Sequence, residues 1–171
     1  MGPMRRLLGI LSLPLAVPVG CALLGAGPVS APNFPDLVRQ AVPPEDGDVL
    51  LFGPGRWFPN AGGFKHAYSG RVEAQIAGVL VIAENAILVQ QWDETRGRLE
   101  PLKRFPLASA TAVTLASFGL NRRLVVRWQD VSVDSFAFQQ LNGAFLDNAK
   151  TEQAVDLMRS NLRERRKEPA E

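Results

Sequence analysis

The feature that most constrains the fold is an alternation of apolar and polar side chains in the second half of the chain. The segment RRLVVRWQ (122–129) places Leu124, Val126 and Trp128 on one side of an extended backbone. The following segment, 131–139, has the same period of two. Antiparallel strands that bury one face of a sheet show this period. The sequence therefore predicts an antiparallel sheet in this half of the chain.

Six further segments have the apolar content and the flanking turn residues of short strands. In chain order they are 48–52, 69–76, 78–83, 85–92, 102–107 and 110–118. Only a short turn separates 78–83 from 85–92, which predicts a hairpin. Pro106 has no amide N–H to donate, so we expect the segment 102–107 at an edge of the sheet.

The last segment, 147–167, changes from a period of two to a helical period. Val155, Met158 and Leu162 follow the spacing i, i+3, i+7 and form an apolar stripe. The carboxylate of Asp147 can accept a hydrogen bond from the first amide groups of a helix, which suits an N-cap. The sequence therefore predicts one C-terminal amphipathic helix.

The stretch 78–162 resembles the pleckstrin-homology (PH) superfamily, in its bacterial PH-like or GRAM-like form. The resemblance is carried by GVLVIAENAILV, RFPLASATAVTL, FGLNRRLVVRW, SFAFQ and TEQAVDLMRSNL. It implies a mainly β domain over 48–166, a small antiparallel barrel of six to seven strands closed by the C-terminal helix, with 167–171 as a frayed tail. It also implies a binding or scaffold module and not an enzyme, since such domains bind phosphoinositide headgroups, peptides or proteins.

Residues 1–26 have the pattern of an export or membrane segment. Arg5 and Arg6 precede a long uncharged apolar run, and such charges stay on the cytoplasmic side while the run enters the bilayer. The segment resembles a bacterial lipoprotein signal, with Gly20 before Cys21, which implies lipid attachment at Cys21. Cleavage a few residues further on, or retention as an uncleaved anchor, remains open.

Residues 27–47 are rich in proline and glycine and predict a tether. Together with the export segment, this predicts an exported or membrane-anchored protein of the cell envelope. The expected partners are the membrane, through the N-terminal segment, and a protein or an anionic lipid. A membrane-anchored lipid-binding domain that faces the cytoplasm is an open alternative.

The candidate binding residues lie in two places. They are Trp57, Phe58, Lys65, Arg122 and Arg123. The first three belong to GPGRWFPNAGGFKHAY (53–68), whose glycines and prolines predict a loop and whose aromatics suit the lip of a cleft. The two arginines stand at the head of a predicted strand near a hairpin turn, where they can meet phosphate or an acidic partner.

Phosphoinositide-binding members of the PH superfamily carry several basic residues in the loop between their first two strands. We expect the matching turn near Ile76-Ala77-Gly78, and it has no basic residue. This departure counts against classical phosphoinositide binding.

The composition excludes several other chemistries. One cysteine and one histidine cannot build a cysteine-rich zinc site or a multi-histidine metal centre, and we expect neither a metal nor a cofactor. The body between the two basic ends is close to neutral, so we expect no nucleic-acid partner. A small envelope hydrolase with His66 as its base is the alternative from a different class.

Overall fold

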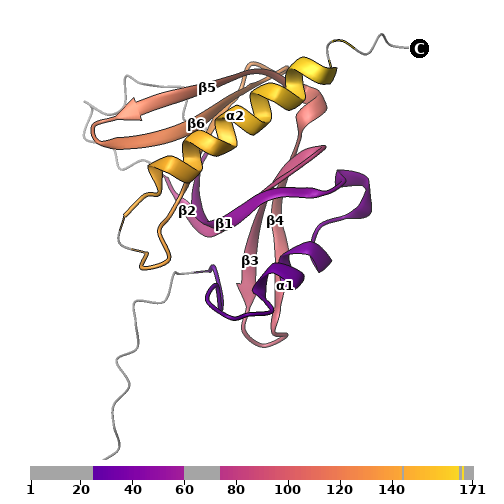
Figure 1. Cartoon of the computed structure of the whole chain (residues 1–171), viewed down its shortest axis with the longest axis vertical. Coiled ribbons are helices and arrows are strands. Elements are labelled where there is room, and N and C mark those ends of the chain that lie inside the picture. The colour runs from indigo at the N-terminus through magenta and orange to yellow at the C-terminus, as the bar shows by residue number, and fades with distance from the viewer. Residues whose placement is uncertain (1–24, 60–73, 144, 166, 168–171) are drawn as a thin grey trace, which may run out of the picture.

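The structure is a computed structural model, and it describes residues 25–59, 74–143, 145–165 and 167 of the 171-residue chain. Seven antiparallel strands form one sheet in the order β4-β3-β2-β1-β7-β6-β5 (Figure 1). The strands are β1 (Val49–Phe58), β2 (Ile76–Ala83), β3 (Ala86–Asp93), β4 (Arg98–Pro106), β5 (Ala110–Phe118), β6 (Asn121–Trp128) and β7 (Val133–Phe138). The helices are α1 (Phe34–Gln40), α2 (Asn148–Arg165) and the 3-10 turns η1 (Pro44–Asp46) and η3 (Leu107–Ser109).

The sheet bends sharply at β1. This strand pairs with β2 along its length but with β7 only from Gly55 to Phe58, so it belongs to both halves of the bent sheet. A Cβ atom at Gly55 would lie 2.5 Å from the side chain of Leu80 and 2.8 Å from the carbonyl oxygen of Ala137. Neighbouring strands approach so closely here that only glycine fits.

The prediction of a loop over 53–68 is wrong for its first part, because residues 53–58 continue β1. Glycine and proline disfavour a strand locally, which is why this stretch has the composition of a loop. The bend needs a residue without a side chain at Gly55, and the carbonyl of Pro54 still accepts a hydrogen bond from the amide of Gln139 at 2.8 Å. Pairing with two neighbouring strands outweighs the local preference.

The other strand predictions of the second half are confirmed. The segments 78–83 and 85–92 correspond to the β2–β3 hairpin, and β4 lies at an edge of the sheet. The alternating segments form β5, β6 and β7, with Leu124, Val126 and Trp128 buried as expected. The C-terminal helix is present as α2, where Asp147 Oδ1 accepts the amide N–H of Lys150 at 2.9 Å.

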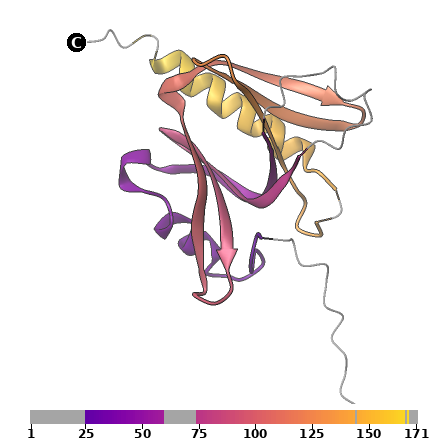
Figure 2. The same ribbon diagram turned by 180° about the vertical axis from the view of Figure 1, so that it is seen from behind.

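Helix α2 lies across one face of β5, β6 and β7 (Figures 1 and 2). Ala154, Val155 and Met158 pack from the helix into the main core, together with aromatic residues of the strands. This arrangement confirms the expectation of a mainly β domain, with seven antiparallel strands and a C-terminal helix packed on them. The barrel is not fully closed, because in the described residues no ladder joins the edge strands β4 and β5.

The N-terminal residues from 25 onward pack against the sheet and form a second core. Ala26, Phe34 and Val38 are buried against the face of β2, β3 and β4 that points away from α2. The buried carboxylate of Asp46 accepts hydrogen bonds from the Arg104 guanidinium at 2.9 and 3.0 Å. The structure thus differs from the expectation of a tether over 27–47, since its few apolar residues find a sheet face to cover.

The predicted membrane segment is 1–26. Its residues 1–24, which include Cys21, lie outside the described residues. Within the described part of the chain, no helix has the length and hydropathy needed to cross a bilayer.

Candidate functional site

A hollow of about 300 Å³ opens on the outer face of the sheet, beside the β5–β6 hairpin. We call it the arginine hollow. Its lining residues are Arg56, Phe58, Gln75, Asn121, Arg123, Phe145 and Leu146. They come from β1, from the residue before β2, from β6 and from the segment between β7 and α2. Segments far apart in the sequence therefore meet at this one place.

The strand register brings the two arginines of the hollow together. Arg56 pairs with Ala137 of β7, and the pairing of Leu124 with Phe136 brings Arg123 beside Ala137 from the other side. Since Leu124 is buried in the core, the alternation of side chains sends Arg123 to the opposite, outer face. Both arginine side chains line the hollow.

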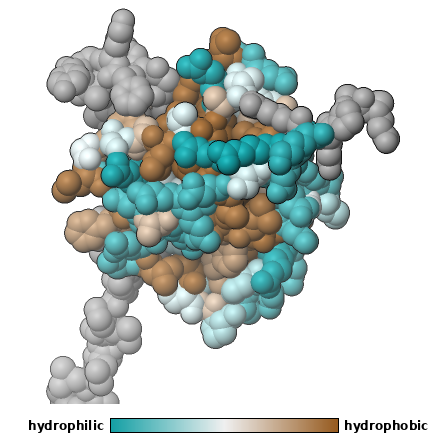
Figure 3. All heavy atoms as spheres, turned by 45° about the horizontal axis from the view of Figure 1, so that its top comes forward, coloured by the Kyte–Doolittle hydropathy of each residue, from teal (hydrophilic) through white to brown (hydrophobic). Residues whose placement is uncertain are grey.

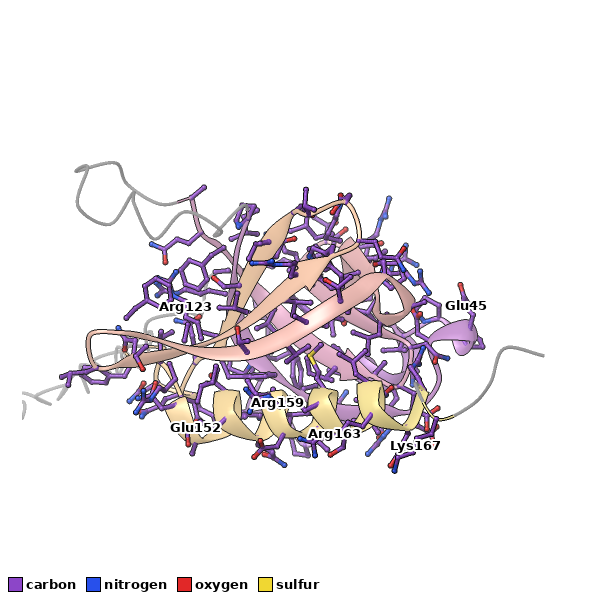
Figure 4. All side chains as sticks on the ribbon, turned by 90° about the horizontal axis from the view of Figure 1, so that it is seen from above. Glu45, Arg123, Glu152, Arg159, Arg163 and Lys167 are labelled. Carbon is purple, nitrogen blue, oxygen red and sulfur yellow. The ribbon has the colours of Figure 1, made fainter. Side chains whose placement is uncertain are left out.

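Aromatic rings hold Arg123 in place. The guanidinium carbon lies 3.6 Å from the ring centroid of Phe58 and 4.1 Å from that of Phe118. Stacking of this kind is favourable and restricts the orientation of the planar group. In Figure 4, Arg123 lies towards the end of the molecule at which α2 begins, the same end as Glu152, and far from Lys167. The sheet thus presents an oriented cation at this end.

Arg56, near the end of β1, is held by the side chain of Gln75, the residue before β2. Its Nη1 donates a hydrogen bond of 2.6 Å to Oε1 of Gln75. Its Nε is buried and has no hydrogen-bond partner among the described residues. Buried donors are normally satisfied, so this N–H is an exception among the described residues.

Of the five predicted binding residues, the structure brings Phe58 and Arg123 together. Arg122 points to the other side of β6, as neighbours in a strand must. Its guanidinium contacts the Ser117 hydroxyl, and its Nε lies 3.5 Å from Oε1 of Glu152 on α2. The two arginines therefore do not form one basic site.

Trp57 faces the interior and not the hollow. Its Nε1 donates to Oδ1 of Asp134 at 2.9 Å, and its ring meets Phe105 edge-on at 5.2 Å between centroids. Lys65 lies outside the described residues, as does His66 of the hydrolase alternative.

Sequence reasoning missed Arg56 and Gln75. The signal for Arg56 was present, since Arg56-Trp57-Phe58 alternates once the segment is taken as a strand. The loop interpretation of 53–68 hid that alternation. Gln75 has no local signal, because its role depends on where β2 begins relative to β1.

A second cleft, of about 630 Å³, lies between β4 and the β6–β7 turn. Its floor includes Trp57, Phe105 and Trp128, and both indole N–H groups donate to the carboxylate of Asp134. At its rim, hydrogen bonds from Ser132 lower the pKa of Asp130. The rings of Phe105 and Trp128 stack on each other at 5.4 Å, so they serve the core first. We therefore regard this cleft as the weaker candidate.

The structure also corrects the argument about the first loop of the domain. The first two strands are β1 and β2, so their connection is 59–75 and not the turn at 76–78. In sequence this connection contains Lys65, His66 and Arg71. The placement of the first loop at 76–78 is therefore wrong, and with it the argument that this loop lacks basic residues. In the parts of the chain that the structure describes, no group of three or more His, Cys, Asp or Glu side chains is placed to hold a metal.

Comparison with solved structures finds similar chains at low identity, one of them a PH domain. The Slm1 PH domain, determined in complex with D-myo-inositol-4-phosphate, is 13% identical, with a TM-score of 0.47 over 66% of this chain and 94% of that chain. A Vav1 structure with an allosteric inhibitor is 10% identical, with a TM-score of 0.48 over 68% and 28% of the two chains. The hSac2 domain of the human phosphoinositide phosphatase Sac2 is 11% identical, with a TM-score of 0.45 over 77% and 80%. No family model and no curated protein matches the chain.

Proposed function

We propose that this protein is an exported, membrane-tethered PH-like binding module of the bacterial cell envelope, without catalytic activity, and that its arginine hollow binds a phosphate-bearing anionic ligand. The observation that carries the proposal is the convergence of two guanidinium groups from different strands on one hollow of about 300 Å³. The described lining residues supply cationic donors, amides and apolar contacts, which suits binding.

The chemistry of the two arginines favours phosphate. A guanidinium group presents a planar fork of N–H donors that matches phosphate or carboxylate oxygens in a bidentate manner. Arg123 is oriented by its rings and Arg56 by Gln75 before any ligand arrives. Such preorganisation lowers the entropy lost on binding. Both arginines line the hollow that a phosphate group would enter.

The location of the protein in the cell envelope is proposed from the export or membrane segment, residues 1–26. Arg5 and Arg6 followed by the apolar run direct the segment to a membrane, and acylation of Cys21 would anchor the mature chain there. The intact mass of the membrane-extracted protein tests this directly. Loss of the residues before Cys21 together with added acyl chains is expected. A full-length, unmodified mass would instead support a retained anchor.

Removal of the guanidinium groups tests the hollow. The full-length protein in detergent, with Arg56→Gln and Arg123→Gln together, would be titrated with glycerol phosphate and with inositol phosphate as soluble probes. Hydrogen bonds to charged groups contribute roughly 1.5–3 kcal/mol each, so we expect a loss of affinity of about ten-fold or more. Nuclear magnetic resonance shifts of the arginine Nε–H groups would report both affinity and location.

Arg127→Gln is the matched control, because Arg127 is exposed on the same strand but does not line the hollow. If this variant lost as much affinity as the double variant, binding would depend on general surface charge, and the proposal would fail. Circular dichroism of each variant would verify that the sheet is intact.

A further inference from the structure

The sheet has two edge strands, β4 and β5, which differ in how they are protected. An edge strand presents unpaired backbone N–H and C=O groups, and proteins usually prevent unwanted pairing there with charged side chains or proline. β4 contains two prolines and four charged residues: Pro101, Pro106, Arg98, Glu100, Lys103 and Arg104. The chain from 107 to 121, which includes β5, has no proline and no charged residue. β5 is therefore the edge that is open to pairing.

The hydrogen bonds of β6 show which backbone groups of β5 point outward. The amide of Trp128 donates to Ser132 on the β7 side, whereas the amide of Gln129 donates to Ser109 on the β5 side. This direction alternates along an antiparallel ladder, so the odd-numbered residues of β6 bond to β5. In the observed register their partners are the even-numbered residues from 112 to 118. The N–H and C=O groups of three residues of β5 therefore point away from β6: Val113, Leu115 and Ser117.

Among the described residues, no strand lies on this outer side of β5. The carbonyl oxygen of Val113 accepts a hydrogen bond of 3.3 Å from Nε of Arg159, which Figure 4 shows midway along α2. A carbonyl oxygen has two lone pairs, so this group can accept a second hydrogen bond. Figure 3, in which the β5 side of the molecule comes forward, shows hydrophobic atoms between rows of hydrophilic ones.

A second copy of β5 complements this edge. If two β5 strands lie antiparallel and centred on Leu115, then Leu115 lies opposite itself and Val113 lies opposite Ser117 of the other copy. All three outward residues then exchange N–H···O=C bonds in both directions. A pairing centred on Thr114 would instead need Thr111, which lies at the irregularity of the β5 ladder. The pairing centred on Leu115 therefore satisfies more of the regular edge.

We propose that β5 docks on β5 of a second copy of this chain, in an antiparallel pair about a two-fold axis at Leu115. Such a contact is isologous, as in most dimers. Because β5 has no charged residue, the pairing brings no like charges face to face. The same edge on the second copy has the same outward groups and the same lack of charge, which favours a second copy over a charged peptide. The inference does not depend on ligand binding by the arginine hollow.

The pairing also fixes how the two arginine hollows are arranged. The two-fold axis of an edge-to-edge antiparallel pair is perpendicular to the sheet, so the same face of both sheets points in one direction. Arg123 lies on the outer face, so the hollows of both copies open on one side of the dimer. This arrangement raises the effective concentration of the second hollow for a ligand with more than one anionic group.

Cysteine cross-linking tests the pairing in the full-length protein in detergent. Thr114 would lie opposite Ala116 of the other copy in a non-hydrogen-bonded pair, where Cα atoms are about 4.5 Å apart, within the range of a disulfide. The variant with Thr114→Cys and Ala116→Cys should therefore give a covalent dimer on mild oxidation, seen on a non-reducing gel.

The matched control has Val125→Cys and Arg127→Cys, which have the same spacing and face but lie on β6, one strand in from the edge. We expect no cross-linked dimer from this variant. The unsubstituted protein shows what Cys21 alone contributes.

Removal of one backbone donor tests the edge hydrogen bonds. Ser117→Pro removes an N–H that points away from β6, and proline is tolerated at such edge positions. Ser117→Ala is the matched control, because it loses the same hydroxyl contact with Arg122 but keeps the N–H. Sedimentation in density-matched detergent measures the dimer dissociation constant, and circular dichroism verifies the fold. Two hydrogen bonds are lost per dimer, so Ser117→Pro should raise this constant about ten-fold or more, whereas Ser117→Ala should leave it unchanged.

Several outcomes would overturn the proposal. One is a dimer that cross-links no better at 114 and 116 than at 125 and 127, since it would use another surface. Another is an equal effect of both changes at Ser117, which would assign the effect to the side chain. A monomer at all concentrations, without cross-links at 114 and 116, would also overturn it. Slow hydrogen exchange at Leu115 in such a monomer would show that a peptide or another segment of the chain covers the edge. None of these outcomes would affect phosphate binding by a single hollow.

Discussion

The guanidinium group of Arg123 covers the ring of Phe58 at 3.6 Å, and Phe58 keeps only 4% of its surface exposed although it lies on the outer face of the sheet. Each residue therefore depends on the other: the ring orients the cation, and the cation shields the ring. The same contact joins β1 to β6 across β7. A change at Phe58 should consequently affect both stability and ligand binding.

Phe58→Leu should weaken binding of phosphate probes by a few-fold, because Arg123 loses a stacking contact that contributes roughly 0.5–2 kcal/mol. Titration of the variant with glycerol phosphate measures this effect. Phe34→Leu is the matched control, since Phe34 is equally buried but packs in the second core. Equal loss of affinity in both variants would show that the effect is a general consequence of destabilisation.

Gly55→Ala should lower the free energy of unfolding by about 1–3 kcal/mol, the usual cost of forcing extra atoms into a packed site. The new methyl group would meet the side chain of Leu80 and the backbone of Ala137. Gly53→Ala should cost much less, because the nearest atom is the mobile Nζ end of Lys150 at 2.8 Å. Urea unfolding of both variants compares them, and similar losses would contradict a special role for Gly55.

Val131→Gly should stabilise the protein by roughly 0.5 kcal/mol, because the left-handed conformation costs a residue with a Cβ about 1–2 kcal/mol and glycine gives back part of that gain in backbone entropy. Val131 has φ of 62° in the β6–β7 turn and is 81% exposed. Val131→Ala removes the exposed side chain but keeps the Cβ, so thermal unfolding should show little gain. A larger gain from alanine than from glycine would show that exposure, and not backbone strain, is the cost.

Lys150 should make stability depend on pH above neutrality. Burial lowers the pKa of its ammonium group in the folded protein, and nearby Asp147 only partly offsets this. Between the lowered pKa and the usual lysine value, the unfolded chain binds more protons than the folded chain, so the free energy of unfolding rises with pH in that window. At pH values below the lowered pKa, the folded protein carries the full free-energy cost of burying the charged ammonium group.

Lys150→Met removes this dependence and should raise stability at neutral pH, because the apolar chain fills the same space over Phe52 and Phe138. Urea unfolding of the native protein and the variant, from neutral to alkaline pH, measures the two slopes. Parallel slopes would mean that the ammonium group is as well solvated in the folded chain as in the unfolded chain.

Much of the fold follows from local pattern. The period of two in β6 and β7, the hairpin of β2 and β3, the edge position of β4 and the apolar stripe of α2 depend on residues close together in the chain. Such patterns determine which face of an element is buried. They therefore predicted an antiparallel sheet and a C-terminal amphipathic helix, whereas closure of the sheet by that helix was implied by the resemblance to PH-like domains.

The set of residues that line the arginine hollow could not be predicted without the tertiary structure. Whether Arg56 lies in a loop or a strand is decided by the pairing of β1 with both β2 and β7, and the neighbour of Arg123 is decided by the register of β6 on β7. Phe34 and Val38 likewise needed the exposed face of β2 to β4 before they could form a core. Sequence alone determined the alternation along each strand, whereas the three-dimensional packing decided which strands meet, because contacts between distant segments depend on shape and burial and leave no periodic signal in the chain.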